Sequence, residues 1–384
     1  MTDTPDHAAA RRRILASATT VVVKVGTNVL ANAAGDLDGH RIQSLADQLQ
    51  RVRVGGRRVA LVTSGAIGAG VGKLKLGTRP TDLPHLQACA AVGQAALMQM
   101  YQESFDRYGV LTAQVLVTAG DFDSRARYLN VRNTVATLFE YNALPIINEN
   151  DTVSVAEIKF GDNDQLAAMT ANLLQAPLLV LLTNVDGLYS ADPREDPAAR
   201  LVPTVEAIDA AVTGLAGATK SRLGTGGMRS KLKAARIATS AGGAVVMANG
   251  ATDGVLDRIF AGDAVGTLFL PQGEAMPAWK RWLGYTAQPR GELTLDAGAV
   301  RAVAEQGKSL LPVGVRGVRG DFGKGDVVSL LDPAGREFAR GLSNYAAAEA
   351  TRIAGRTTDA LARAGGPLPP YAELIHRDNL VVVG

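Results

Sequence analysis

Short runs of β-branched and aliphatic residues alternate with longer segments rich in Ala, Leu and Gln between residues 20 and 250. The runs predict strands at Thr20–Val25, Val59–Thr63, Val110–Val117, Leu144–Ile147, Leu178–Leu182 and Ala244–Met247. The segments between them predict helices at Gly39–Val54, Leu83–Tyr108, Arg125–Tyr141, Asp164–Leu174 and Met228–Ala241. Elements that alternate in this way form an open, mainly parallel sheet with helices on its faces. The predicted fold class is therefore α/β.

The chain is longer than one hydrophobic core usually serves, because its 384 residues exceed the roughly 100–200 of a compact domain. The pattern changes after residue 270, where Pro271, Gly273, Pro277 and Pro289 interrupt it. From Glu292 onward, short strands with Gly turns predict a small barrel-like β domain. We expect an N-terminal extension at 1–17, an α/β domain at 18–270, a linker at 271–288 and a β-rich domain at 289–384.

Composition and charge exclude few partners. Apolar residues make up 47% of the chain and charged residues 20%, which is typical of a globular protein and not of a disordered one. The net charge of +3 suits anionic ligands but is too small to demand nucleic acid. The basic run Arg11–Arg13 near the N-terminus is expected to be solvated.

The single cysteine, Cys89, excludes an intramolecular disulfide, and its apolar surroundings predict a buried thiol. The N-terminus lacks the charged-then-apolar order of a secretory signal. No stretch approaches the roughly 18 uninterrupted apolar residues of a membrane span. The expected location is the cytoplasm.

Distinctive loops follow the predicted strands, which is where ligands bind in open α/β sheets. The first strand ends with Lys24 and Gly26, which suit a phosphate group, although a strand-end lysine is also commonly a solvated charge. The motif G-x-x-x-x-G-K-[ST] is absent. The second strand runs into Ser64 and Gly65, whose turn offers backbone N–H donors to an anion. The alternative is a tight turn that needs glycine only for packing.

The densest polar cluster contains Asn148, Asp151 and, ten residues later, Asp162, Asn163 and Asp164. Carboxylates and amides there could bind a substrate ammonium group or a hydrated Mg²⁺. The alternative is an Asx-rich turn that caps the helix beginning at Asp164.

Two later loops add further candidates. Thr183 and Asn184 follow a buried strand and precede an Asp-Gly pair. Such a pair is typical of a turn, so the turn alone could account for part of this segment without any function. A glycine loop at 224–227 then enters a helix that carries Lys231 in its first turn. Lysine is unfavourable at a helix N-terminus unless an anion lies there, so a bound phosphate would suit this loop. A generic glycine linker is the alternative.

The four histidines, His7, His40, His85 and His376, all lie outside these loops, so a histidine base is not expected. A hydroxyl acceptor generally benefits from such a base, whereas a carboxylate with a pKa of roughly 4.3 is already anionic at neutral pH. Phosphoryl transfer to a carboxylate would need chiefly positioning and charge neutralisation.

The ordered segments K-V-G-T-N, V-T-S-G-A-I, I-N-E-N-D, G-D-N-D, L-T-N-V-D-G-L-Y and G-T-G-G-M-x-x-K resemble the amino acid kinase family. The resemblance spans about residues 18–270, and the C-terminal part is similar to a PUA domain. It implies an amino acid kinase-like sheet sandwiched by helices and a small PUA-like domain. It also implies the branch of the family that phosphorylates the γ-carboxylate of L-glutamate with ATP, the first step of proline biosynthesis.

The resemblance also implies residue roles. Lys24 and Lys231 would flank the transferred phosphoryl group, and Asp164 would orient their ammonium groups. Glutamate would be bound by Ser64, Asp151 and Asn163, with Asn148 and the amide of Gly65 as helpers. The implied ATP contacts are Lys24, Thr183, Asn184, Thr225, Gly226, Gly227, Met228, Arg229, Ser230 and Lys231. Mg²⁺ is expected with ATP, with Asp162 or Asp164 as its candidate ligands. Asn184 stands where many members of the family carry Asp.

Alternatives remain open at this point. A relative acting on aspartate, N-acetylglutamate, carbamate or UMP could share the same loops, although Asp151 favours a substrate with a free amine. The PUA-like domain could bind RNA through Arg316, Arg319, Lys324 and Arg336, or could serve regulation or assembly. The implied partners are L-glutamate, L-proline as feedback inhibitor, further copies in a dimer or tetramer, and glutamyl phosphate reductase.

Overall fold

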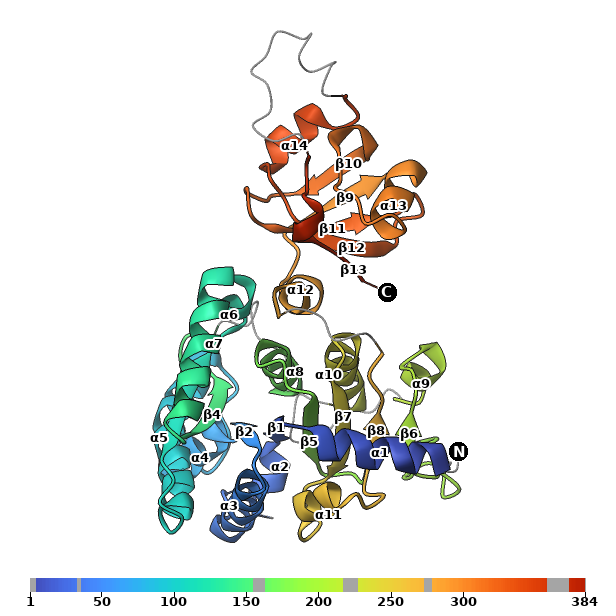
Figure 1. Ribbon diagram of the computed structural model, residues 1–384. Helices are drawn as coiled ribbons and strands as arrows, with labels where there is room; N and C mark the ends of the chain where they lie inside the picture. The colour runs from blue at the N-terminus through green and yellow to red at the C-terminus, as the bar shows by residue number, and fades with distance from the viewer. Residues whose placement is uncertain are drawn as a thin grey trace. The chain divides into compact units, whose positions relative to one another are not determined.

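The computed structural model describes residues 5–32, 36–154, 163–216, 227–272, 278–357 and 373–383. The chain divides into two compact units, Met1–Met276 and Pro277–Gly384. Each unit has a hydrophobic core of its own. Figure 1 shows the elements of both units.

An eight-stranded sheet forms the centre of the first unit, as far as its described residues show. The strands are β1 (Thr20–Val25), β2 (Arg58–Val62), β3 (Thr112–Val117), β4 (Leu144–Glu149), β5 (Leu178–Thr183), β6 (Thr204–Val205), β7 (Ala244–Asn249) and β8 (Thr267–Phe269). Their order is β3-β4-β2-β1-β5-β7-β8-β6, and every neighbouring pair is parallel except β7 and β8. The prediction of a mainly parallel sheet is confirmed.

Helices cover both faces of this sheet (Figure 1). Val21, Val23 and Val25 of β1 belong to the core cluster that includes residues of α1 (Pro5–Ser17), α3 (Gly39–Val54), α5 (Leu83–Asp106) and α11 (Val255–Ala261). The opposite face meets α7 (Arg125–Glu140), α8 (Asn163–Leu173) and α10 (Met228–Ser240). All six residues of β1 and of β5 are buried, which explains their continuous apolar runs. Shorter helices are α2 (Thr27–Leu30), α4 (Ala66–Lys73), α6 (Ala119–Asp123) and α9 (Ala210–Gly214).

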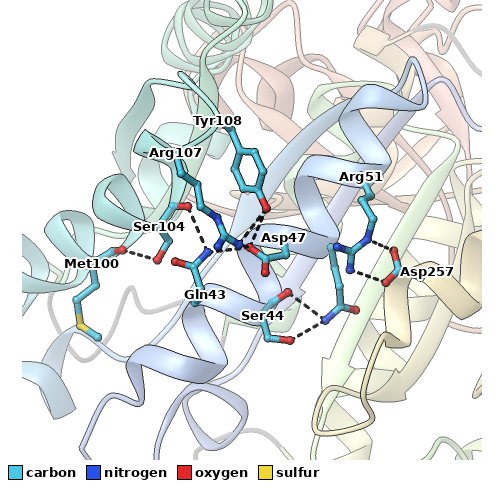
Figure 2. A network of polar contacts seen from close by, with 10 residues as sticks. Gln43, Ser44, Asp47, Arg51, Met100, Ser104, Arg107, Tyr108 and Asp257 are labelled. Atoms are coloured by element: carbon cyan, nitrogen blue, oxygen red, sulfur yellow. Dashed lines mark hydrogen bonds and ion pairs between the residues drawn. The ribbon is translucent and has the colours of Figure 1, made fainter.

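Polar contacts tie α3 to its neighbours on the outer side (Figure 2). Arg51 on α3 makes two hydrogen bonds with Asp257 on α11, at 2.8 and 2.7 Å. Asp47 on α3 pairs with Arg107 and accepts a hydrogen bond from the Tyr108 hydroxyl at 3.0 Å. These side chains are partly exposed to solvent, so each contact contributes only modestly to stability.

The helices α4 and α5 cross very closely because each has a glycine that faces the backbone of the other helix. A Cβ on Gly70 would lie 1.8 Å from the carbonyl oxygen of Cys89, and one on Gly93 would lie 1.8 Å from that of Ala66. Cys89 is buried beside this crossing, so the predicted buried thiol is confirmed. The crossing matters for function because α4 begins directly after the Ser64–Gly65 turn.

Arg11 contradicts the expectation of a solvated basic run at the N-terminus. Its side chain is 1% exposed, and its guanidinium donates hydrogen bonds of 2.9 Å to the carbonyls of Val265 and Pro203. The physical reason is that α1 packs on the unit, which brings Arg11 to carbonyl groups next to β6 and β8. Arg12 and Arg13 are exposed as expected.

The second unit is β-rich, as predicted. Its described strands are β9 (Gly291–Leu295), β10 (Val315–Gly320), β11 (Val327–Leu331), β12 (Glu337–Leu342) and β13 (Leu380–Val382), in the order β10-β9-β11-β12-β13. Only β9 and β11 pair in parallel among them. After residue 288, the described part of this unit also contains α13 (Ala297–Ala304), α14 (Ala347–Ile353) and short helical turns.

The expected linker at 271–288 is helical in its second half. The segment contains α12 (Ala278–Arg281) and a π-helical turn at Trp282–Thr286. Trp282 and Leu283 are buried, and this turn contacts β12 and β13. Apolar burial therefore makes these residues part of the second unit. No helix in the described ranges is long and apolar enough to cross a membrane.

Candidate active site

A pocket opens at the carboxyl ends of β1, β2, β4 and β5, where the strand order reverses between β1 and β5. Such a reversal point is where open α/β sheets bind ligands. Ten of the residues predicted from the sequence line this one pocket: Lys24, Ser64, Gly65, Asn148, Asp151, Asn163, Asp164, Thr183, Asn184 and Lys231. Residues more than 200 positions apart in the sequence thus meet in one place.

A buried group of two ammonium ions and one carboxylate lies in this pocket. Lys24 Nζ is 2.5 Å from Asp164 Oδ1, and Lys231 Nζ is 2.9 Å from Asp164 Oδ2. The exposed fractions of the three residues are 6% for Lys24, 8% for Lys231 and 1% for Asp164. Burial alone would raise the pKa of Asp164, but the two lysines lower it to about 2. Asp164 is therefore an anion at neutral pH.

Three elements of the fold bring these side chains together. Lys24 is the penultimate residue of β1 and points away from Val23 and Val25, toward the face that α8 covers. Asp164 lies in the first turn of α8, where a negative charge is favourable. Lys231 lies near the start of α10, where a positive charge is unfavourable until the carboxylate of Asp164 compensates it.

Side-chain amides form the second half of the pocket. Asn163 Nδ2 lies 2.8 Å from Ser64 Oγ and 2.9 Å from Asn148 Oδ1. Asn148 in turn donates a hydrogen bond of 2.9 Å to Gln94 Oε1 on α5. Asp151 lines the same region just after β4. The arrangement combines hydrogen-bond donors and acceptors with a carboxylate.

The turn between β2 and α4 supplies backbone donors. Gly65 has φ = 109°, a left-handed conformation that favours glycine, and it precedes the first turn of α4. Amides in a first helical turn have no partner within the helix and suit an anion. Thr63 Oγ1 is 2.9 Å from the hydroxyl of Tyr101 on α5, which anchors the turn. Burial raises the pKa of Tyr101, so this hydroxyl keeps its proton.

The residues predicted to bind ATP are only partly brought together. Thr183 and Asn184 line the pocket at the end of β5, with Thr183 Oγ1 3.3 Å from Asn184 Oδ1. The start of α10 contains Gly227, Met228 and Arg229, which are not among the residues that line the pocket. The hydroxyl of the next residue, Ser230, lies 3.5 Å from Asp164 Oδ2. Thr225, Gly226 and Asp162 fall outside the described residues. Nucleotide contacts by the segment 225–230 stay a prediction.

Direct metal binding by Asp164 is not favoured, because each of its oxygens already lies against an ammonium group. Within the described ranges, no three His, Cys, Asp or Glu side chains gather as a metal site.

Several lining residues were not predicted from the sequence. They are Thr27 to Val29, Ala66 to Gly68, Arg79, Glu149 and Leu182. Glu149 is buried at the end of β4 and accepts a hydrogen bond of 3.0 Å from the Ser154 hydroxyl. Its position within I-N-E-N-D was a usable signal, whereas nothing in the sequence around Arg79 marks it. Gln94 lies behind the pocket and was also missed.

Comparisons with known proteins show which family the chain belongs to. The model of the amino acid kinase family matches residues 19–249, and the model of the PUA domain matches residues 291–364. The glutamate 5-kinase of Moorella thermoacetica is 47% identical over 373 residues, covering 97% of this chain and 98% of that protein. The glutamate 5-kinase of Pseudomonas aeruginosa is 47% identical over 366 residues, covering 94% and 97%. That of Nitrosospira multiformis is 47% identical over 370 residues, covering 96% and 99%.

Proposed function

This chain belongs to the amino acid kinase family, with a C-terminal PUA domain, and from that premise we propose that it is a glutamate 5-kinase. The reaction transfers the γ-phosphoryl group of ATP to the side-chain carboxylate of L-glutamate. An oxygen of the carboxylate attacks the γ-phosphorus. The bond between the γ-phosphorus and the oxygen that bridges it to the β-phosphate breaks, and ADP leaves. The product is L-glutamyl 5-phosphate, the first intermediate of proline biosynthesis.

The observation that carries this proposal is the buried Lys24–Asp164–Lys231 group. Phosphoryl transfer spreads negative charge over the oxygens of the moving group, and two ammonium ions held in a dry site stabilise that charge. Asp164 holds both ammonium groups in place before the substrates arrive. A carboxylate acceptor is already ionised at neutral pH, so the reaction needs no general base.

The amide side of the pocket suits the amino acid. Asp151 provides a carboxylate for the substrate ammonium, and Ser64, Asn148 and Asn163 provide neutral hydrogen-bonding groups around it. Arg79 and the first amides of α4 are available for a substrate carboxylate. A free α-amine therefore fits better than an acetylated one, which carries no charge for Asp151 to neutralise.

ATP is the phosphoryl donor expected of a kinase of this family. We propose that Thr183 and Asn184 contact the nucleotide, together with the 225–231 segment, and that Mg²⁺ enters with the phosphates. The ion would supply charge neutralisation at the β- and γ-phosphates. The residues of this chain would position the phosphates through Lys24 and Lys231.

Further parts of the proposal rest on family membership. They are feedback inhibition by L-proline, assembly into a dimer or tetramer, and transfer of the labile product to glutamyl phosphate reductase. RNA binding by the second unit is less favoured, because Arg316 pairs with Asp296 at 2.9 Å and Arg336 pairs with Asp332 at 2.8 Å. These ion pairs engage two of the four cations that could face an RNA phosphate.

Trapping with hydroxylamine tests the activity, because hydroxylamine converts an acyl phosphate to a hydroxamate. The purified chain with ATP and Mg²⁺ should form hydroxamate with L-glutamate, and far less with aspartate or N-acetylglutamate. UMP should give no ADP. A well-folded chain that forms no hydroxamate from L-glutamate would refute the proposal.

A further inference from the structure

A chain of side-chain amides runs from the pocket to Gln94, a residue that does not line it. Gln94 lies on α5 and is 7% exposed. Its Oε1 accepts a hydrogen bond of 2.9 Å from Asn148 Nδ2. Asn148 Oδ1 lies 2.9 Å from Asn163 Nδ2, which also lies 2.8 Å from Ser64 Oγ. The last three residues line the pocket.

Two backbone groups determine which way each amide in the chain points. The carbonyl of Thr63 can only accept, and it lies 2.6 Å from the Asn163 side chain, so the atom facing it is the nitrogen. The N–H of Glu149 can only donate, and it lies 2.9 Å from the Asn148 side chain, so the atom facing it is the oxygen. The nitrogen of Asn148 must then face Gln94, which has to offer an oxygen.

This polarity decides what the pocket presents to a ligand. The two hydrogens of Asn163 Nδ2 are shared among Thr63, Ser64 and Asn148. Asn163 Oδ1 has no hydrogen-bond donor among the residues that the structure describes, so it can accept from a ligand. Ser64 Oγ receives a hydrogen from Asn163, so its own hydroxyl hydrogen is available for an anion. An acceptor and a donor side by side match an ammonium group and a carboxylate on one substrate.

Stability alone does not explain a glutamine at this position. Its neighbours on the buried side of α5 include Ala90, Gly93 and Leu97. Among the described residues, the buried Nε2 of Gln94 has no hydrogen-bond acceptor. A buried amide nitrogen without an acceptor destabilises the fold, and an apolar side chain of similar length would avoid that loss. The oxygen of Gln94 is the part that the structure uses.

We propose that Gln94 is a positioning residue for the amino acid substrate. By accepting a hydrogen bond from Asn148, Gln94 keeps the amides of Asn148 and Asn163 in one orientation. In that orientation the acceptor Asn163 Oδ1 and the donor hydroxyl of Ser64 face the substrate. The proposal rests on the proposed function, because it takes L-glutamate as the ligand. Gln94 itself touches neither substrate.

The test compares substitutions at position 94 in the full chain. Gln94→Met keeps the length of the side chain but removes the acceptor, and Gln94→Asn withdraws the acceptor by one methylene. Both should raise the KM for L-glutamate roughly five- to thirtyfold, since an orphaned amide costs that much affinity, with kcat changed less than about threefold. Gln94→Glu retains an acceptor, so its KM for L-glutamate should lie within about threefold of the KM of the unchanged chain.

A second readout separates positioning from a general structural effect. Glutarate lacks the α-amine, so the ratio of its Ki to the KM of L-glutamate measures recognition of the ammonium group. This ratio should fall in Gln94→Met and stay constant in Gln99→Met, a control on the exposed side of the same helix. Thermal unfolding should show that both variants are folded.

The outcomes are distinct. Unchanged KM and unchanged ratio in folded Gln94→Met and Gln94→Asn chains would overturn the inference while the kinase activity stands. An equal loss in Gln94→Glu would also overturn it, because the acceptor would then not matter. No turnover of L-glutamate by the unchanged chain would refute the proposed function, and the assignment of Gln94 with it.

Discussion

Replacing Asp164 by asparagine tests whether the buried lysines depend on its charge. The substitution keeps the shape of the side chain but leaves Lys24 and Lys231, both less than 10% exposed, without their shared carboxylate. The pKa of Asp164 is lowered from 3.8 to about 2, and this difference corresponds to about 2 kcal/mol of stability at neutral pH. Removing one partner from a buried ion pair commonly costs about 3–5 kcal/mol. We therefore expect the variant to lose about 2–5 kcal/mol.

Urea denaturation can follow the two units separately. Both tryptophans of the chain, Trp279 and Trp282, belong to the second unit, so tryptophan fluorescence reports on that unit. Far-UV circular dichroism is dominated by the helices of the first unit. Asp164→Asn should shift the circular dichroism transition to lower urea and leave the fluorescence transition in place.

A matched control removes a carboxylate from an exposed ion pair in the same unit. Arg51 and Asp257 are 57% and 37% exposed, so Asp257→Asn should cost less than about 1 kcal/mol. Equal stability of Asp164→Asn and the unchanged chain would refute the reasoning, because two buried ammonium ions would then need no counter-charge.

Four further outcomes follow from the same structure. The stability difference between Asp164→Asn and the unchanged chain should persist at pH 5 and above and vanish as the pH falls from about 4 to about 2. The reason is that a lowered carboxylate pKa stabilises the fold only while Asp164 is ionised. Urea denaturation of both chains at a series of pH values measures this difference. Lys24→Met should lower kcat at least about a hundredfold in the hydroxamate assay while the chain stays folded, since an ammonium group near the phosphoryl group is lost. Asp151→Asn should raise the KM for L-glutamate about tenfold or more with a smaller effect on kcat, and an unchanged KM would remove Asp151 from the substrate site. Gly93→Ala should lower the unfolding free energy by at least about 1–3 kcal/mol, because the new Cβ would lie 1.8 Å from the carbonyl oxygen of Ala66. Gly77→Ala is the control: a Cβ there would have no other atom within 4 Å, so the unfolding free energy should change by less than about 0.5 kcal/mol.

The sequence predicts the sheet well because its central strands are buried on both faces. β1 and α3 have the predicted bounds, Thr20–Val25 and Gly39–Val54. β5 extends the prediction by one residue, to Thr183. Continuous apolar runs and a 3.6-residue period are local signals that survive folding unchanged. Loop residues at strand ends are then placed together by the topology of a parallel sheet, which explains why ten predicted residues line one pocket.

The features that the sequence did not predict depend on contacts between distant segments. Arg11 binds carbonyls about 190 and 250 positions away, and Gln94 contacts Asn148 across 54 positions. Trp282 is buried in a turn that contacts β12 and β13. An arginine, a glutamine or a proline-flanked tryptophan looks the same in the sequence whether such partners exist or not.

Oxygen tracing tests the central claim, that a side-chain carboxylate of glutamate attacks ATP. L-Glutamate labelled with ¹⁸O in both γ-carboxylate oxygens is turned over with ATP, Mg²⁺ and hydroxylamine, and the released phosphate is examined by mass spectrometry. Hydroxylamine attacks the acyl carbon, so phosphate leaves with the oxygen that bridged it to carbon. The account predicts one ¹⁸O atom in each phosphate released with hydroxamate. Phosphate free of ¹⁸O would show that water attacked ATP instead, and would contradict the account.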